Sequence, residues 1–96
     1  MSNITEFELD WEGIKILIKH THKAWGVIEH IELHSIDPPE AELPMTDTGY
    51  ISHYIDESYI EAEGGVESYV LAWLSHDAAK PAWQAKKLAA RQYSLF

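Results

Sequence analysis

The chain contains no cysteine, which excludes disulfide bonds and metal sites built on thiolates. It has no long apolar run either, and its apolar segments fall far short of the roughly 20 residues that a membrane-spanning helix needs. Residues 1–6 lack the basic stretch and the apolar run of a signal peptide. We therefore expect a cytoplasmic protein without a membrane span.

Basic residues are scarce over most of the chain. All 16 acidic residues lie at or before Asp77, and residues 1–79 contain only three Lys, so this part carries a net charge of −13. Residues 80–96 contain no acid and four basic residues: Lys80, Lys86, Lys87 and Arg91. An acidic body repels nucleic acid, and four basic charges are too few for a DNA-binding arm. Direct binding of the body to nucleic acid is therefore not expected.

Apolar side chains are plentiful. They make up 46% of the residues and include four Trp and five Tyr, a composition too apolar for a disordered chain. A length of 96 residues suits one compact domain. We predict a single domain over residues 1–91 and a separate C-terminal peptide over residues 92–96.

Residues 5–20 predict a β-hairpin. Apolar and charged residues alternate on both sides of Glu12-Gly13, a pair that suits a two-residue hairpin loop. With this loop, one face of the hairpin is apolar and opposite charges meet across the strands on the other. Six residues of the apolar face are predicted to be core residues: Phe7, Leu9, Trp11, Ile14, Ile16 and Ile18.

Residues 25–35 predict a third strand, with Val27, Ile31 and Leu33 on one face. A pair of prolines ends it, because proline lacks the N–H that a strand ladder uses. A short fourth strand is predicted near residues 50–54, followed by a turn or a short helix.

Two helices are predicted in the C-terminal part. Apolar residues recur at helical spacing in residues 66–77, and Pro81 suits the first turn of a second helix over about residues 82–91. Tyr50 and Tyr54 are expected to pack against these helices. The whole pattern predicts an α+β fold, in which two C-terminal helices cover one face of a three- or four-stranded antiparallel meander.

Histidines are the candidate metal ligands. His30, Glu32 and His34 alternate along the predicted third strand and therefore share one face. Imidazoles and a carboxylate are ligands of zinc and iron, and His20 or His22 would come near this face if the second and third strands pair. This spacing is also typical of a solvated strand face. We therefore predict no bound metal or cofactor.

A catalytic hydroxyl is not indicated. Ser52 and His53 are adjacent and lie on opposite faces of a strand, so they cannot form a nucleophile–base pair there. The loop before them is typical of turn chemistry, with Gly49 a candidate for a positive φ. A non-enzymatic protein is therefore the expected class.

The last five residues are Gln92, Tyr93, Ser94, Leu95 and Phe96. Two adjacent large apolar residues at a chain end are typical of anchors that fill a preformed cavity on a partner. Alternatively, Leu95 and Phe96 fold back and cap the core of the domain itself.

The pattern Gln92-x-Ser94-Leu95-Phe96 resembles the motif by which bacterial proteins bind the β sliding clamp of the replication machinery. The resemblance implies that Gln92 forms hydrogen bonds at the rim of a pocket, which Leu95 and Phe96 fill. Tyr93 stands where that motif usually has Leu. Residues 43–54, the Gly64-Gly65 pair and the following helix resemble short uncharacterised proteins of bacteria and their mobile elements, which implies no activity.

The sequence favours a small non-enzymatic interaction protein that docks on the sliding clamp through residues 92–96. Two alternatives stay open. One is an acidic inhibitor that imitates DNA and occupies a nucleic-acid-binding protein. The other is a small metal-dependent enzyme built on His30, Glu32 and His34.

Overall fold

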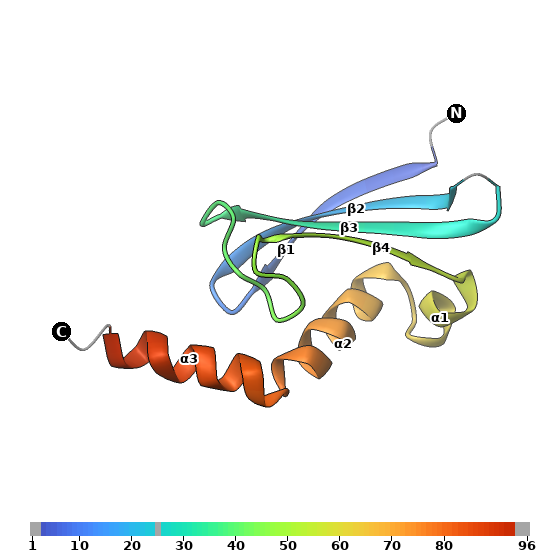
Figure 1. The fold of residues 1–96 in the computed structure, drawn as a ribbon. Coiled ribbons are helices and arrows are strands. Elements are labelled where there is room, and N and C mark those ends of the chain that lie inside the picture. The colour runs from blue at the N-terminus through green and yellow to red at the C-terminus, as the bar shows by residue number, and fades with distance from the viewer. Residues whose placement is uncertain (1–2, 25, 94–96) are drawn as a thin grey trace.

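The structure is a computed structural model that describes residues 3–24 and 26–93, with side chains as far as Ala89. The elements in these residues follow one another along the chain (Figure 1): β1 (Ile4–Trp11), β2 (Ile14–Ala24), β3 (Ile28–Asp37), β4 (Tyr50–Ile55), α1 (Glu57–Ala62), α2 (Val66–Ala78) and α3 (Pro81–Tyr93). All strands therefore precede all helices.

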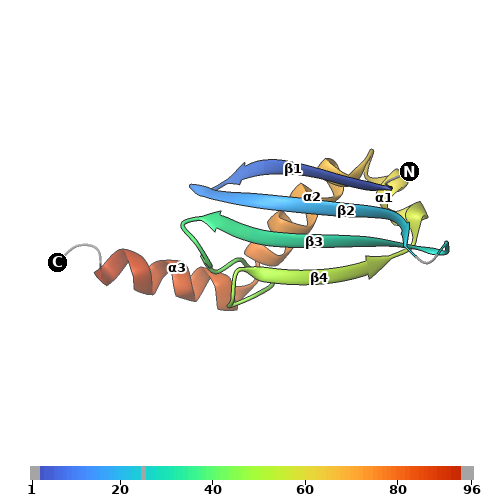
Figure 2. The ribbon, with the colours of Figure 1, turned by 90° about the horizontal axis from the view of Figure 1, so that it is seen from above.

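The strands form one antiparallel sheet in the order β1-β2-β3-β4. Figures 1 and 2 show the helices on one side of this sheet, with α3 running out beyond it. The predicted α+β fold is confirmed. The sheet has four strands, and the short helix α1 lies between β4 and α2, where the sequence predicted a turn or a short helix. Within the described part of the chain, no helix is long and apolar enough to cross a membrane.

The predicted N-terminal hairpin is confirmed with its register. Trp11 lies opposite Ile14, and the pairing continues without a shift along β1 and β2. Glu12 and Gly13 both have a positive φ, 45° and 83°, as the loop of a tight hairpin requires. Of the six predicted core residues, four are buried and the outer two are half-buried against them: Leu9, Trp11, Ile16 and Ile18, then Phe7 and Ile14.

The third strand differs from the prediction at its start. Val27 lies in the turn before β3 and is 80% exposed, so its predicted place on the buried face is wrong. The chain turns at Gly26, which has a φ of 77°, and the strand begins only at Ile28. Ile31 and Leu33 are fully buried, and the alternation of β3 then turns Glu29 toward the same face.

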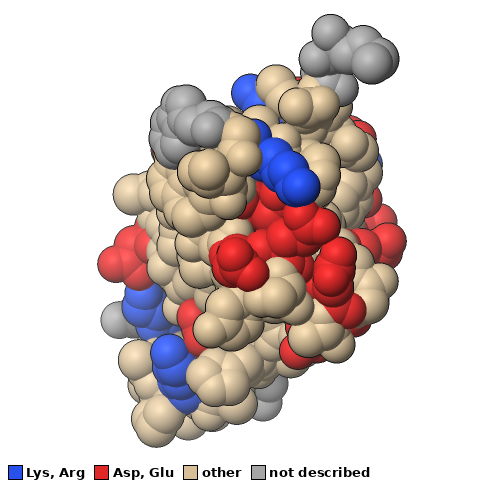
Figure 3. Space-filling model, turned by 90° about the vertical axis from the view of Figure 1, so that its right-hand side faces the viewer, with Lys and Arg blue, Asp and Glu red and all other residues tan. Residues whose placement is uncertain are grey.

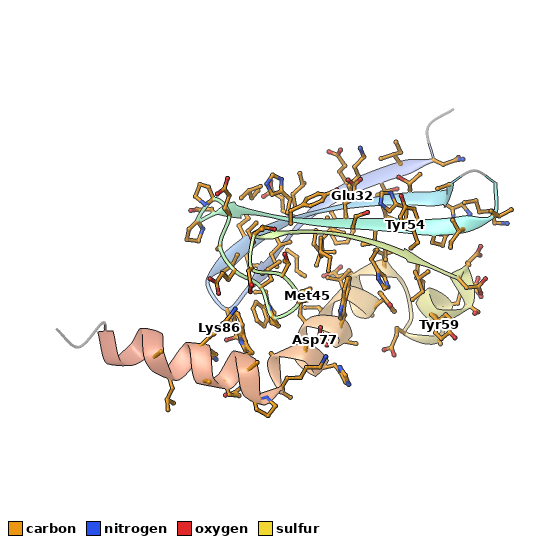
Figure 4. All side chains as sticks on the ribbon, in the orientation of Figure 1. Glu32, Met45, Tyr54, Tyr59, Asp77 and Lys86 are labelled. Carbon is orange, nitrogen blue, oxygen red and sulfur yellow. The ribbon has the colours of Figure 1, made fainter. Side chains whose placement is uncertain are left out.

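The fourth strand also corrects one expectation. Tyr50 and Tyr54 lie on the sheet face away from the helices and are 45% and 47% exposed, so the prediction that they pack against the helices is wrong. The alternation of β4 turns Ile51, His53 and Ile55 toward the helices instead. Figure 4 shows Tyr54 and Glu32 on this open face.

Helix α2 supplies the helical side of the core, as its apolar spacing predicts. Val70 and Leu74 are fully buried, and Tyr69 and Trp73 pack beside them. Three residues of the opposite side face water as predicted: Glu67, Ser68 and Ser75. The core is thus one layer between the sheet and α2, closed at its edges by Leu43 and by the other helices.

We expect Ile16→Ala to lower the free energy of unfolding by roughly 2–5 kcal/mol, because the fully buried side chain leaves a cavity between sheet and helix. Urea unfolding followed by circular dichroism measures this loss. The matched control is Val27→Ala, which should change stability by less than about 0.5 kcal/mol because Val27 is 80% exposed. Equal effects of the two substitutions would contradict the assigned core.

Candidate functional site

The predicted docking segment begins within α3. The helix continues past the predicted end at Arg91 and includes the backbone of Gln92 and Tyr93. Ser94, Leu95 and Phe96 lie outside the described residues.

Helix α3 is attached to the body through its first half. The Trp83 ring lies 6.0 Å from that of Trp11, centroid to centroid. Lys86 donates a hydrogen bond to Asp47 at 2.6 Å, and Lys87 donates one to Glu12 at 2.8 Å. These contacts tie α3 to the hairpin loop and to the loop before β4 (Figure 4 labels Lys86).

The second half of α3 leaves the body. Leu88 is 58% exposed, and among the described side chains the core includes no residue after Trp83. Figure 1 shows the end of α3 at one extremity of the molecule, whose principal extents are 52 × 23 × 18 Å. The chain is therefore carried away from the sheet as it approaches the predicted docking segment.

The basic residues near the C-terminus are largely neutralised by the body. Lys80 lies 3.2 Å from the Asp77 carboxylate, and Lys86 also lies 3.3 Å from Glu42. The hydrogen bond to Asp47, and then the one to Glu42, raises the pKa of Lys86 above its usual value of 10.5. Lys80, Lys86 and Lys87 are therefore each paired with a carboxylate of the body.

The strand face with the candidate metal ligands carries His30, Glu32 and His34, but their polar atoms do not converge on one point. The Nε2 atom of His30 lies 2.6 Å from the Ser52 hydroxyl, and Glu32 accepts a hydrogen bond from the Tyr50 hydroxyl at 2.6 Å. The nearest approach of His30 to Glu32 is 3.9 Å, from Nδ1 to Oε2. These three residues therefore form separate contacts on an open sheet face.

Ser52 and His53 lie on opposite faces of β4, as predicted, and the structure pairs Ser52 with His30 instead. This is a hydroxyl–imidazole contact that the sequence analysis missed, because it joins strands that are far apart in the sequence. Glu32 lies too far from Nδ1 of His30 to orient the ring by a hydrogen bond. The geometry therefore lacks the third member of a catalytic triad.

Two other histidines do converge on a carboxylate. His20 Nε2 and His22 Nδ1 lie 2.8 and 2.7 Å from the same atom, Oε1 of Glu29. The ligand atoms of His20, His22 and Glu29 all lie within 4.8 Å of one another. Among the described residues, these three form the group of His and acidic side chains that could hold a metal. The expectation that His20 or His22 approaches the His30 face is wrong, because they turn toward the helix side of the sheet.

Glu29 is the central residue of this cluster and is 2% exposed. Burial raises the pKa of its carboxyl, but hydrogen bonds from His22, the Lys23 amide and His20 outweigh burial and lower the pKa below 4.5. The sequence signal was available, because Glu29 shares its strand face with Ile31 by alternation and is an acid at an apolar position.

An open groove of about 340 Å³ lies along α2. Its lining residues are Glu63, Tyr69, Ala72, Trp73 and His76. His53 contacts two of these residues: its ring centroid lies 4.4 Å from that of Trp73, and its Nε2 lies 3.0 Å from the Tyr69 hydroxyl. Burial lowers the pKa of His53 below 6.5, so its imidazole is neutral at pH 7 and serves here as a packed aromatic ring.

Acidic side chains gather around α1. Residues 56–67 contain five acids and no Lys or Arg. Figure 3, which views this end of the molecule, shows the red acidic side chains in one broad patch. Lys23 borders it, 3.9 Å from Glu57.

These features define a small α+β domain: a four-stranded antiparallel meander backed by helices, with a projecting C-terminal helix. The chain belongs to the family of the KlcB third domain, whose model matches residues 4–83. The match covers the sheet, α1, α2 and the start of α3, and it ends before the predicted docking segment. No curated protein and no solved structure is significantly similar to the chain.

Proposed function

We propose that this chain is a small non-enzymatic interaction protein of the bacterial cytoplasm that docks on the β sliding clamp through residues 92–96. The observation that carries the proposal is the course of α3. Trp83, Lys86 and Lys87 hold the first half of the helix against the body, and the described part of the second half ends at an extremity of the molecule.

The segment supplies the chemistry of a docking peptide. Leu95 and Phe96 bring apolar area for a preformed pocket, and Gln92 brings an amide that can donate and accept hydrogen bonds at its rim. Because the match to the KlcB third domain stops at residue 83, the proposal depends on the segment itself and on α3.

The body is suited to act as a rigid support. The hydrogen bonds from Lys86 to Asp47 and from Lys87 to Glu12 connect α3 to loops at one end of the sheet. The acidic groups that accept them neutralise Lys86 and Lys87. We expect recognition to depend mainly on the apolar anchors of the segment.

Isothermal titration calorimetry of the full chain against a purified bacterial β clamp tests the proposal. We expect saturable binding with a Kd in the micromolar range, which corresponds to about −8 kcal/mol. The affinity is modest because a short segment that becomes ordered on binding loses conformational entropy. No detectable heat at high micromolar concentration would refute clamp docking.

The acidic patch around α1 favours a second candidate, an inhibitor that imitates DNA. A chain lacking residues 92–96 should then capture a nucleic-acid-binding protein from bacterial lysate, and duplex DNA should release that protein in a salt-dependent way. Reversing charge in the patch with Glu61→Lys and Glu63→Lys should weaken the capture. If duplex DNA releases none of the captured protein, the DNA-mimic function is refuted.

A further inference from the structure

We propose that His20, His22 and Glu29 form a binding site for a divalent transition-metal ion, with Zn²⁺ as the ion of choice. Two imidazole nitrogens and one carboxylate oxygen are a zinc ligand set that leaves a fourth position for water. The sequence analysis considered His30, Glu32 and His34 as candidate ligands and predicted no bound metal. The site proposed here is built from other residues.

The site lies at a β-bulge. Alternation places His20 and His22 on the same face of β2. The register of β2 and β3 then shifts between Thr21 and Ala24, so that His22 and Lys23 stand opposite the single residue Glu29. The backbone N–H of His22 also donates to the carbonyl of Asn3 at 2.9 Å, which ties the bulge to the N-terminal strand.

The carboxylate is held so that one oxygen is available to a metal. The Lys23 amide donates to Oε2 of Glu29 at 2.6 Å, while both imidazoles point at Oε1. A hydrogen bond to the second oxygen of a ligating carboxylate is a typical outer-shell contact, because it fixes the orientation of the ligand.

The two contacts to Oε1 of Glu29 require little rearrangement. Zinc bonds of about 2.0–2.1 Å in tetrahedral geometry place neighbouring ligand atoms about 3.3 Å apart. The two nitrogens lie 2.8 and 2.7 Å from Oε1, so each contact needs to open by about half an ångström. The half-exposed His22 side chain, with 47% of its surface accessible, leaves a route for the ion and for a water ligand.

Charge also favours an ion at this position. The Glu29 side chain is 2% exposed, so water screens its carboxylate little. Lys23, which borders the cluster, directs its ammonium toward Glu57, 3.9 Å away. A divalent cation between the three ligand atoms would place positive charge next to this buried carboxylate.

Zinc titration of the chelator-treated full chain tests the site. Calorimetry should show one zinc per chain, and Co²⁺ in place of zinc should give the visible absorption bands of a low-symmetry, nitrogen- and oxygen-ligated ion. The thermal midpoint should rise with zinc concentration, because an ion that binds only the folded state stabilises it.

Two matched variants locate the ion. His22→Gln should lower zinc affinity at least tenfold, roughly the scale seen when groups around a metal are removed, and should keep the circular dichroism of the original chain. His34→Gln removes an exposed imidazole on the opposite sheet face and should leave zinc affinity unchanged. Glu29→Gln removes the third ligand. If that variant fails to fold, the comparison of His22→Gln with His34→Gln still tests where the ion binds.

The proposal is overturned if the chain binds no zinc at micromolar concentration, or if His34→Gln weakens binding as much as His22→Gln does. In either case the three residues are a hydrogen-bonded cluster that stabilises the bulge. The site and the end of α3 lie at opposite ends of the molecule in Figure 1, so clamp binding and zinc binding can fail independently.

Discussion

A Gly49→Ala chain should unfold far more easily than the original chain, with a loss of about 2–5 kcal/mol. A positive φ costs a side chain about 1–2 kcal/mol, and forcing atoms into a packed region typically costs about 1–3 kcal/mol more. Gly49 has a φ of 79°, and a Cβ there would lie 2.7 Å from the backbone carbon of Glu40. Backbone cannot swing aside as a side-chain tip can, so the loop before β4 must shift.

Gly13→Ala is the matched control. Gly13 has a similar φ of 83°, but a Cβ there would meet nothing within 4 Å. Only the conformational cost of about 1–2 kcal/mol remains. Urea unfolding of both variants separates the steric cost from the conformational cost. Equal losses would show that the close approach of Gly49 to Glu40 does not constrain the loop.

The double substitution Leu95→Ala and Phe96→Ala should abolish clamp binding while leaving the fold intact. Each side chain contributes on the order of 1.5–3 kcal/mol if fully buried on the partner. Losing both removes roughly 3–6 kcal/mol, or at least about a hundredfold in Kd. A micromolar complex would then escape detection by calorimetry.

Leu88→Ala is the control for this experiment, because Leu88 is an exposed leucine of α3 that lies outside the motif. Its clamp affinity should match that of the original chain. Circular dichroism and urea unfolding of the double variant complete the test. If the double variant loses several kcal/mol of stability, Leu95 and Phe96 cap the core, and the docking proposal is wrong.

Local patterns were sufficient for the regular elements. The alternation around Glu12-Gly13 predicted the hairpin and its register, because a shift by one residue would turn the apolar face to water. The apolar stripe of α2 likewise predicted the burial of Val70 and Leu74. The errors in element bounds fall at Val27 and at the end of α3, where propensity is weak and turn geometry decides.

The candidate metal site was predictable only in part. Alternation places Glu29 on the buried face of its strand, beside Ile31, and places His20 and His22 on one face of theirs. That the three residues share one face of the sheet, and that His22 and Lys23 stand opposite Glu29 at a bulge, depends on pairing between strands. A bulge leaves no clear trace in hydrophobic periodicity, because it changes pairing between strands and not composition within one.

The sequence by itself determined the α+β class, the hairpin register and the chemistry of residues 92–96, because these depend on alternation, helical spacing and residue type within short segments. The tertiary structure decided which face of β4 is buried and which carboxylate the histidines meet. It also decided how far α3 stays attached to the body. Each of these depends on pairing between segments far apart in the chain. Lys87 and Glu12, 75 residues apart, are held 2.8 Å from each other only because the whole sheet and helix layer has formed.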